Sequence, residues 1–285
     1  MHDQAERLRQ RVNEEKAPRT SKTISIVSGK GGVGKSTTVL NFALELQKKK
    51  KRVLIFDLDI GMGNIDILLG QQSKHHILNF FEEFLPIHDM IEVGPNGLSY
   101  IAGGTAFDRL LELDENKLEY FFSQYELLTK SYDYIFFDLG AGMSKTSLAF
   151  ILASDEIFLV LTPEPTSIAD GYSAMKQIVK ENPSLPIIAV MNRSPSIREG
   201  DRMLAKFASV ANQFLQKDIV QLGSLPYDKI VPKSVSSQTP YVLLKENAAV
   251  SKAMRELVDR YLHAETGVKR NGSFIQKFKK FLLVR

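Results

Sequence analysis

The sequence predicts an α/β protein with a mostly parallel sheet flanked by helices on both faces. Short apolar runs of strand length alternate along the chain with segments of helical period. Several of these runs are apolar throughout, which is typical of strands buried on both faces of a sheet. Alternating strand and helix units favour parallel pairing, and such sheets bind their ligands at the carboxyl ends of the strands.

Seven strands are expected in order along the chain, over residues 23–28, 52–59, 98–102, 133–139, 156–162, 186–192 and 219–225. The segment 36–50 between the first two has the helical pattern, with Val39, Phe42, Ala43 and Leu46 at i, i+3, i+4 and i+7. We expect the compact domain to span residues 22–265. A polar arm, residues 1–21, precedes it, and a linker with a last short helix, residues 266–285, follows it.

Composition and charge exclude several classes of site. The chain has no cysteine, which removes disulfides, thiol catalysis and cysteine–metal sites. Its net charge of +4 is concentrated at the C-terminus, because residues 266–285 hold six of the 37 basic residues and no acid. The rest of the chain has 31 basic against 33 acidic residues, so we expect a near-neutral body with a basic anchor and consider nucleic acid an unlikely partner.

The first residues are charged and lack the apolar core of a secretory signal. No window approaches the roughly 20 apolar residues that a membrane span requires. We therefore expect a cytoplasmic protein.

The stretch SGKGGVGKST, residues 28–37, contains the phosphate-binding pattern G-x-x-x-x-G-K-[ST] from Gly29 to Ser36. It follows an expected strand and precedes an expected helix, the context in which this P-loop binds phosphate. Backbone N–H groups of the loop and the positive end of the helix should surround a triphosphate. The expected ATP-binding residues are Gly29, Lys30, Gly31, Gly32, Val33, Gly34, Lys35, Ser36 and Thr37.

Three carboxylates end strands beside this loop. Asp57 and Asp59 end the second expected strand, and Asp138 ends the fourth. A carboxylate at a strand tip beside a P-loop holds Mg²⁺ through its water shell, and the P-loop serine is a direct ligand. We therefore expect Ser36, Asp57 and Asp138 to form the magnesium site.

Lys30 is one lysine more than the phosphate-binding pattern requires. The sequence KGGVGKST resembles the deviant Walker A motif of the MinD/ParA family of ATPases. The resemblance implies a homodimer formed on ATP binding, in which Lys30 touches the phosphates of the partner's ATP. By the same resemblance Lys30, Lys35 and Asp59 are the catalytic residues, and Asp59 positions the attacking water.

Three further segments resemble this family. LTPEPTSIADGY, residues 161–172, resembles a segment near the dimer and partner face, which implies a partner-binding role for Asp170. MNR, residues 191–193, resembles the adenine-contacting segment and assigns that role to Asn192. LPYD, residues 225–228, resembles the adenine loop and places Pro226 beside the base.

Residues 274–285 read FIQKFKKFLLVR and form one apolar face on a helix. This pattern is typical of a helix that lies in a membrane interface, and MinD relatives carry a comparable membrane-targeting helix. The expected anionic-membrane contacts are Phe274, Ile275, Phe278, Phe281 and Leu282. The alternative is a helix packed on its own domain. We expect it to dock there without ATP and to reach the inner face of the cell membrane when ATP is bound.

The segment DQAERLR, residues 3–9, resembles the N-terminal motif of the flagellar FlhG (YlxH, FleN) branch of the family. That branch sets flagellar number and placement, and its arm activates the GTPase FlhF. The resemblance implies that Gln4, Leu8 and Arg9 contact an FlhF-type GTPase, and that flagellar switch-complex proteins are further partners. A DNA-partitioning ParA, supported by the KKKKR run at 48–52, and a division-site MinD remain the alternatives.

Overall fold

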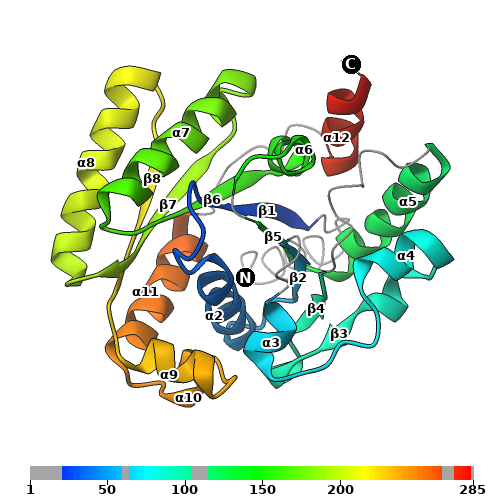
Figure 1. Ribbon diagram of the computed structural model, residues 1–285, viewed down its shortest axis with the longest axis horizontal. Helices are drawn as coiled ribbons and strands as arrows, with labels where there is room; N and C mark the ends of the chain where they lie inside the picture. Colours follow the sequence, from blue (N-terminus) through cyan, green and yellow to red (C-terminus); the bar gives the residue numbers. More distant parts are fainter. Residues whose placement is uncertain (1–20, 60–63, 104–114, 141, 265–272, 284–285) are drawn as a thin grey trace, which may run out of the picture.

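The computed structural model describes residues 21–59, 64–103, 115–140, 142–264 and 273–283. These residues form one eight-stranded sheet with helices on both faces, in the strand order β3-β4-β2-β5-β1-β6-β7-β8 (Figure 1). All strand pairs are parallel except β3 with β4. The predicted fold class is therefore confirmed.

The seven expected strands are present, with ends within two residues of the expected ones. They are β1 (Lys22–Val27), β2 (Val53–Leu58), β4 (Ser99–Ile101), β5 (Tyr134–Leu139), β6 (Glu156–Leu161), β7 (Ile187–Ser194) and β8 (Val220–Pro226). The eighth, β3 (Glu92–Val93), was not expected. Two residues are too few to give a periodic signal, and this strand is defined by its antiparallel partner β4.

Two groups of helices cover the two faces of the sheet. One face carries α4 (Ile77–Glu83), α5 (Glu115–Ser131), α6 (Lys145–Ala153), α7 (Pro165–Glu181), α8 (Ile197–Leu215) and α12 (Phe274–Leu283). The other carries α2 (Lys35–Lys48), α3 (Ile65–Leu69), α9 (Ile230–Ser236), α10 (Tyr241–Leu244) and α11 (Ala249–Ala264). Short 3₁₀ turns lie at Ile87–Met90 and Pro95–Gly97.

The central strands are buried on both faces. Every residue of β1, β2, β5 and β6 is buried, which explains why these runs are almost continuously apolar. Because the strands are parallel, the segments that follow β1, β2 and β5 meet at one edge of the sheet. This edge brings the P-loop and the three expected carboxylates together.

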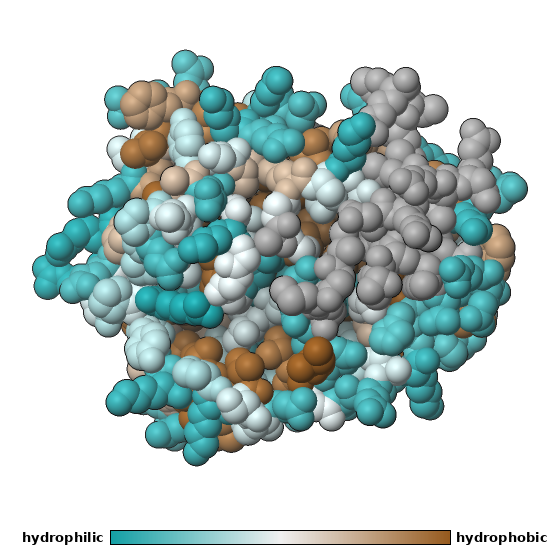
Figure 2. Space-filling view, in the orientation of Figure 1, coloured by the Kyte–Doolittle hydropathy of each residue, from teal (hydrophilic) through white to brown (hydrophobic). Residues whose placement is uncertain are grey.

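The surface is mixed in character. Figure 2 shows hydrophilic and hydrophobic side chains interspersed over one face, with an apolar patch in its lower part, in the region of α3 and α9. Ile67 of α3 and Val235 of α9 are among the exposed large hydrophobic residues. In the described part of the chain, no helix is both long enough and apolar enough to cross a membrane.

Candidate functional site

The P-loop lies between β1 and α2 as expected. Gly32 and Gly34 have φ values of 76° and 90°, a region that glycine enters without a steric penalty. Gly34 caps the start of α2, and its carbonyl accepts a hydrogen bond from Thr38 N at 2.9 Å. Ser28 Oγ donates to the carbonyl of Lys30 at 2.8 Å, so the loop is held in place by its own residues.

Gly29 brings the P-loop against α7. A Cβ atom built on Gly29 would lie 2.0 Å from the carbonyl carbon of Asp170, so no larger residue fits. Asp170 itself is exposed. The two expected site residues, which are far apart in sequence, are therefore adjacent at one edge of the candidate site.

Asp57 and Asp138 are paired in register on the neighbouring strands β2 and β5. Asp57 is buried and accepts hydrogen bonds from the backbone N–H groups of Asn64 at 2.7 Å, Asp59 at 3.1 Å and Ile65 at 3.1 Å. Asp138 is fully buried, and among the described residues neither of its carboxylate oxygens has a hydrogen-bond partner of good geometry. A buried carboxylate with both oxygens unsatisfied is unusual and requires an explanation.

The buried carboxyl groups hold protons more tightly than free ones. Burial raises the pKa of Asp57 to about 6, against the opposing effect of its backbone hydrogen bonds. Burial, together with the nearby charge of Asp57, raises the pKa of Asp138 to about 7, although Ser36 and Lys35 oppose the rise. Burial also raises the pKa of Asp59, and the charge of Lys35 lowers it.

These residues fit a magnesium ion. The hard oxygen donors of Asp57, Asp138 and Ser36 are of the type that Mg²⁺ prefers. A cation beside Asp138 would satisfy its oxygens and return both carboxyl groups to the charged form. The chemistry of the donor set and the orphaned carboxylate together support the predicted metal residues.

Two glycines that we did not single out shape the carboxylate cluster. A Cβ on Gly140, just after β5, would lie 2.7 Å from Oδ1 of Asp59, so the glycine allows this carboxylate to approach the end of β5 closely. A Cβ on Gly103, just after β4, would lie 2.8 Å from the carbonyl oxygen of Asp57. Gly140 comes two residues after Asp138, at the end of an expected strand. Its place beside this strand-end carboxylate is the sequence signal that could have identified Gly140 as a site residue.

Lys30 points to a neighbouring element of its own chain. Its Nζ donates to Oε2 of Glu164 and to Oγ1 of Thr166, both at 3.2 Å. Both side chains of the ion pair are substantially exposed, 43% for Lys30 and 58% for Glu164. The contact is therefore weak and easily exchanged for another.

Asn192 lies against the P-loop. Its Nδ2 donates to the carbonyl of Val33 at 2.8 Å, and its Oδ1 accepts from the backbone N–H of Arg193 at 2.9 Å. Pro226 ends β8 and lies next to β7, where it pairs with Ser194. The strand ends that carry Asn192 and Pro226 are therefore neighbours.

The C-terminal helix α12 is docked on the body of the protein beside α6 (Figure 1). Phe274 is 5% exposed and Phe278 is 0% exposed, and both belong to the main hydrophobic core. Their rings contact those of Tyr125 in α5 at 4.6 Å and Phe150 in α6 at 4.9 Å, respectively, between ring centroids. Ile275 and Phe281 are partly buried against the same core.

Polar contacts of Lys277 also hold α12 on the body of the protein. Lys277 Nζ donates to Oδ1 of Asp155 at 2.9 Å and to the carbonyl of Ser154 at 3.3 Å. Oδ2 of Asp155 accepts from the backbone N–H of Thr23. The sequence pattern of residues 274–285 predicts only an apolar face, and it gave no sign of the inward ion pair of Lys277.

Two expected contact regions are not fully described. Gln4, Leu8 and Arg9 lie outside the described residues. Leu282 lies within α12, but its side chain is outside the described part.

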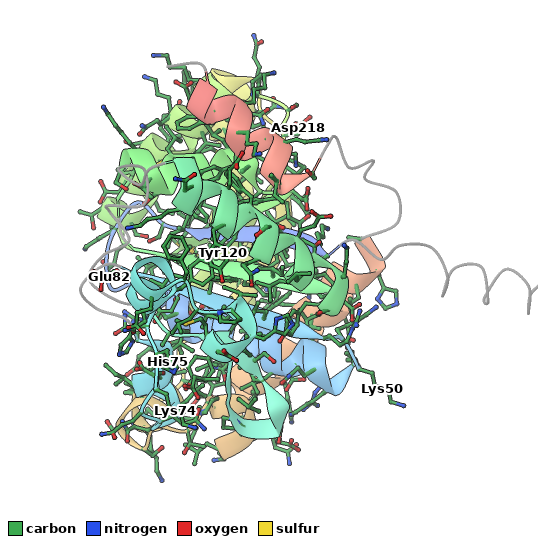
Figure 3. All side chains as sticks on the ribbon, turned by 90° about the vertical axis from the view of Figure 1, so that its right-hand side faces the viewer. Lys50, Lys74, His75, Glu82, Tyr120 and Asp218 are labelled. Carbon is green, nitrogen blue, oxygen red and sulfur yellow. The ribbon has the colours of Figure 1, made fainter. Side chains whose placement is uncertain are left out.

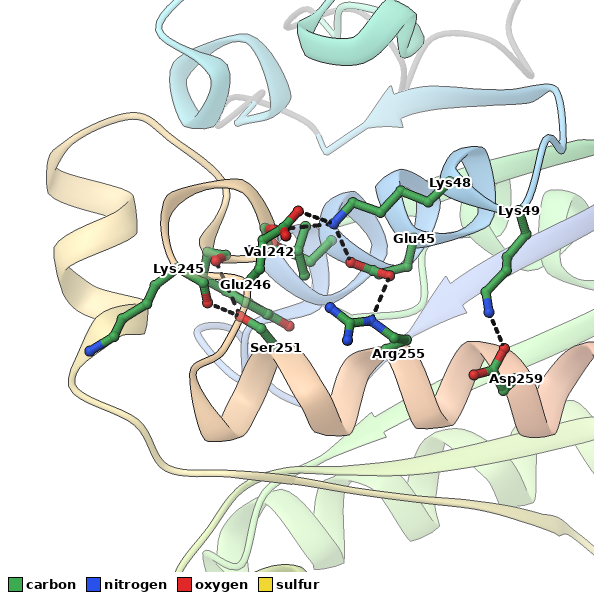
Figure 4. A network of polar contacts seen from close by, with 11 residues as sticks. Glu45, Lys48, Lys49, Val242, Lys245, Glu246, Ser251, Arg255 and Asp259 are labelled. Carbon is green, nitrogen blue, oxygen red and sulfur yellow. Dashed lines mark hydrogen bonds and ion pairs between the residues drawn. The ribbon is translucent and has the colours of Figure 1, made fainter.

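The basic run 48–52 is largely neutralised by acids of the same chain. Lys48 Nζ lies 2.9 Å from both Glu45 and Glu246, and Lys49 pairs with Asp259 (Figure 4). A further pair joins Arg52 to Asp133 at 3.0 Å. Lys50 extends away from the body at the amino-end side of the sheet (Figure 3).

Comparison with known proteins identifies the family. Residues 19–262 match the ParA family, described as NUBPL iron-transfer P-loop NTPase. The flagellum site-determining protein YlxH of Helicobacter pylori is 31% identical over 297 residues, covering 99% of this chain and 100% of that protein. The antiactivator FleN of Pseudomonas aeruginosa is 29% identical over 215 residues, covering 75% of this chain and 77% of that protein.

Solved structures of the cell division protein MinD have the same fold. The MinC:MinD complex of Aquifex aeolicus matches with a TM-score of 0.67 and 26% identity, covering 88% of this chain and 100% of that chain. MinD of Pyrococcus horikoshii OT3, complexed with Mg-ADP, matches with a TM-score of 0.68 and 22% identity, covering 86% and 96%. With a P-loop, strand-end carboxylates and a family match over most of its length, the chain belongs to the ParA/MinD family of P-loop NTPases.

Proposed function

We propose that this protein is an ATPase that dimerises on binding ATP, binds an anionic membrane surface through α12 and regulates flagellar number and placement. The observation that carries the ATPase proposal is the meeting of the P-loop with Asp57, Asp59 and Asp138 at one sheet edge. Such a site needs only to position a water and to stabilise the charge that develops on the transferred phosphoryl group.

Each site residue has a role in this proposal. Lys35 binds the β- and γ-phosphates, and Ser36, Asp57 and Asp138 hold Mg²⁺, which neutralises charge on the phosphate oxygens when bound. Asp59 orients the attacking water, and in support of this role its carboxylate is only partly buried, whereas Asp57 and Asp138 are buried. The partner's Lys30 supplies positive charge to the same phosphates, which makes hydrolysis depend on dimerisation.

The contacts of Lys30 are compatible with a role in trans. The amino group is occupied by Glu164 and Thr166 and not by its own P-loop. An exposed ion pair is worth about 0–1 kcal/mol, so a partner's triphosphate would displace it readily. Asp170, adjacent to Gly29, lies on the surface where a second copy or a partner protein would approach.

The docking of α12 supports a membrane switch. Phe274 and Phe278 are buried in the core and are not accessible to lipid in this arrangement. Membrane binding therefore requires α12 to leave its groove. We propose that ATP-driven dimerisation releases it through α6, the helix that follows the strand carrying Asp138 and packs against α12.

The flagellar role rests on similarity to YlxH and FleN and on the arm motif at residues 3–9. We propose that Gln4, Leu8 and Arg9 contact an FlhF-type GTPase. A division-site MinD shares the same ATPase chemistry. The DNA-partitioning alternative is disfavoured because Lys48, Lys49 and Arg52 already pair with acids of the chain.

The ATPase proposal is tested by phosphate release from ATP by the full-length protein with Mg²⁺. Wild-type protein should hydrolyse ATP slowly, and Asp59→Ala should bind ATP but not hydrolyse it. Hydrolysis by Asp59→Ala at the wild-type rate would remove the assigned role of this residue.

A further inference from the structure

The groove that holds α12 selects a short pattern of side chains. Phe274 and Phe278 fill it from one face of the helix. The rings that line it are Phe122 and Tyr125 of α5, Phe137 of β5 and Phe150 of α6. Lys277 lies on the same face and donates to Oδ1 of Asp155 at 2.9 Å. The groove therefore holds a helix with an apolar residue at i, a cation at i+3 and a second apolar residue at i+4.

The release of α12 would leave this groove without its ligand. Its aromatic lining would then face water, and an exposed apolar surface of this kind binds other apolar segments. Oδ2 of Asp155 would still accept from Thr23 N–H, but Oδ1 would lose its cation. The released state would therefore offer a site for a second helix with the same pattern of side chains.

The N-terminal arm contains this pattern. Leu8, Arg11 and Val12 stand at i, i+3 and i+4, in the order apolar, cation, apolar. They repeat the spacing and the chemical types of Phe274, Lys277 and Phe278. The arm lies outside the described residues, so this match is one of sequence.

The arm is joined to the body at the wall of the groove. The described chain begins at Ser21, whose N–H donates to the carbonyl of Thr129 in the last turn of α5 at 3.0 Å. Two residues later, the N–H of Thr23 donates to Asp155 at 3.0 Å, and its Oγ1 lies 2.7 Å from the phenol oxygen of Tyr125. The arm therefore leaves the body beside two residues that contact α12.

The length of the arm is sufficient for it to reach the groove. Val12 precedes Ser21 by nine residues, which span up to about 30 Å when extended. The ten-residue helix α12 is only about 15 Å long. A tether this short gives the arm a millimolar effective concentration at the groove, so weak contacts are enough for docking.

We propose that, when α12 leaves, the groove binds residues 8–12 of the arm, with Leu8 and Val12 against the aromatic rings and Arg11 at Asp155. The inference rests on the proposed function, because it takes the release of α12 from it. Leucine and valine bury less apolar surface than two phenylalanines, so α12 displaces the arm whenever it is off the membrane. Leu8 faces the groove in this state. The membrane-bound protein therefore withholds the arm from a GTPase.

The test is hydrogen–deuterium exchange of the full-length protein, which reports on α12 and the arm in one sample. Phe278→Glu places a charge where the native side chain is 0% exposed, so α12 leaves the groove without any membrane. With ADP, the amides of residues 8–12 should exchange about 10-fold more slowly in Phe278→Glu than in the wild type, and those of α12 should exchange faster. Wild-type protein with Mg²⁺, ATP and anionic liposomes should show the same slowing in the arm, which gives a second test in a chain with its native core.

Two charge reversals separate docking in the groove from contact of a basic arm with lipid. Arg11→Glu should remove the protection of residues 8–12 in both settings. Arg7→Glu makes the same change of charge outside the i, i+3, i+4 set and should leave the protection in place. Fast exchange of α12 without slower exchange of the arm, or an equal loss of protection in the two reversals, would overturn the proposal. If α12 of the wild type stays protected with ATP and liposomes, the membrane switch fails instead, and Phe278→Glu still decides whether the arm binds the groove.

Discussion

Removing the charge of Asp155 tests whether its ion pair with Lys277 holds α12 in the docked position. Asp155→Asn keeps an oxygen that accepts from Thr23 N–H, but it removes the ion pair with Lys277 at 2.9 Å. Both partners are mostly buried, with 23% and 12% of their side chains exposed. A charged hydrogen bond of this kind contributes about 1–2 kcal/mol after allowance for solvent screening. The equilibrium between docked and released α12 should therefore shift by about 5- to 30-fold.

The assay is flotation with anionic liposomes in the presence of ADP. Since Asp155 is not part of α12, the substitution leaves the membrane-binding residues intact. Wild-type protein should stay mostly unbound with ADP, and Asp155→Asn should bind to a clearly larger extent. Asp133→Asn is a matched control, because Asp133 is also an aspartate outside α12 and pairs with Arg52. If the fraction of Asp155→Asn that floats with liposomes in ADP is no larger than that of the wild type or the control, the ion pair does not hold α12 in place.

Three further outcomes are expected. Lys30→Ala should bind ATP normally in titration calorimetry, but it should neither dimerise nor hydrolyse ATP. If it loses ATP binding as completely as Lys35→Ala does, Lys30 acts on the nucleotide of its own chain and not on that of the partner. In Mg²⁺-free buffer, the raised pKa of Asp138, about 7 against 3.8, makes folded protein bind its proton more tightly than unfolded protein, so stability falls as pH rises from about 4 to 7. In urea unfolding, Asp138→Asn should therefore raise the free energy of unfolding by about 1–3 kcal/mol at pH 8 and flatten this fall, and an unchanged pH profile would contradict the reasoning. A peptide of residues 1–20 should stimulate GTP hydrolysis by an FlhF-type GTPase. The Gln4→Ala peptide should not stimulate it, although it should lose less of its affinity for the GTPase. If the wild-type peptide does not stimulate GTP hydrolysis at a saturating concentration, the arm gives no support for the FlhG-type assignment, and only the general MinD assignment is left.

Local sequence patterns were enough to predict the fold and the residues at the centre of the candidate site. Buried strands of a parallel sheet are continuous apolar runs, so their places and their carboxyl ends are visible in the sequence. The P-loop pattern and the strand-end positions of Asp57 and Asp138 therefore predicted that these groups would meet. The register places Asp57 directly beside Asp138, a detail that follows from strand order and not from either segment alone.

Contacts between distant segments were not predictable in the same way. The approach of Gly29 to Asp170 and the contact of Lys30 with Glu164 join segments more than 130 residues apart. The groove for α12 is assembled from α5, β5 and α6, so the sequence of the helix shows an apolar face without showing what covers it. Its ion pair with Asp155 depends on that same assembly.

The most direct test of the central claim is light scattering of Asp59→Ala in excess Mg²⁺ and ATP, compared with ADP. The substitution should spare nucleotide binding and prevent hydrolysis, so an ATP-bound state would accumulate. The account predicts a dimer near twice the chain mass of 32.1 kDa with ATP and a monomer with ADP. A monomer in both nucleotides, with ATP binding verified in the same sample, would contradict the proposal that ATP drives dimerisation.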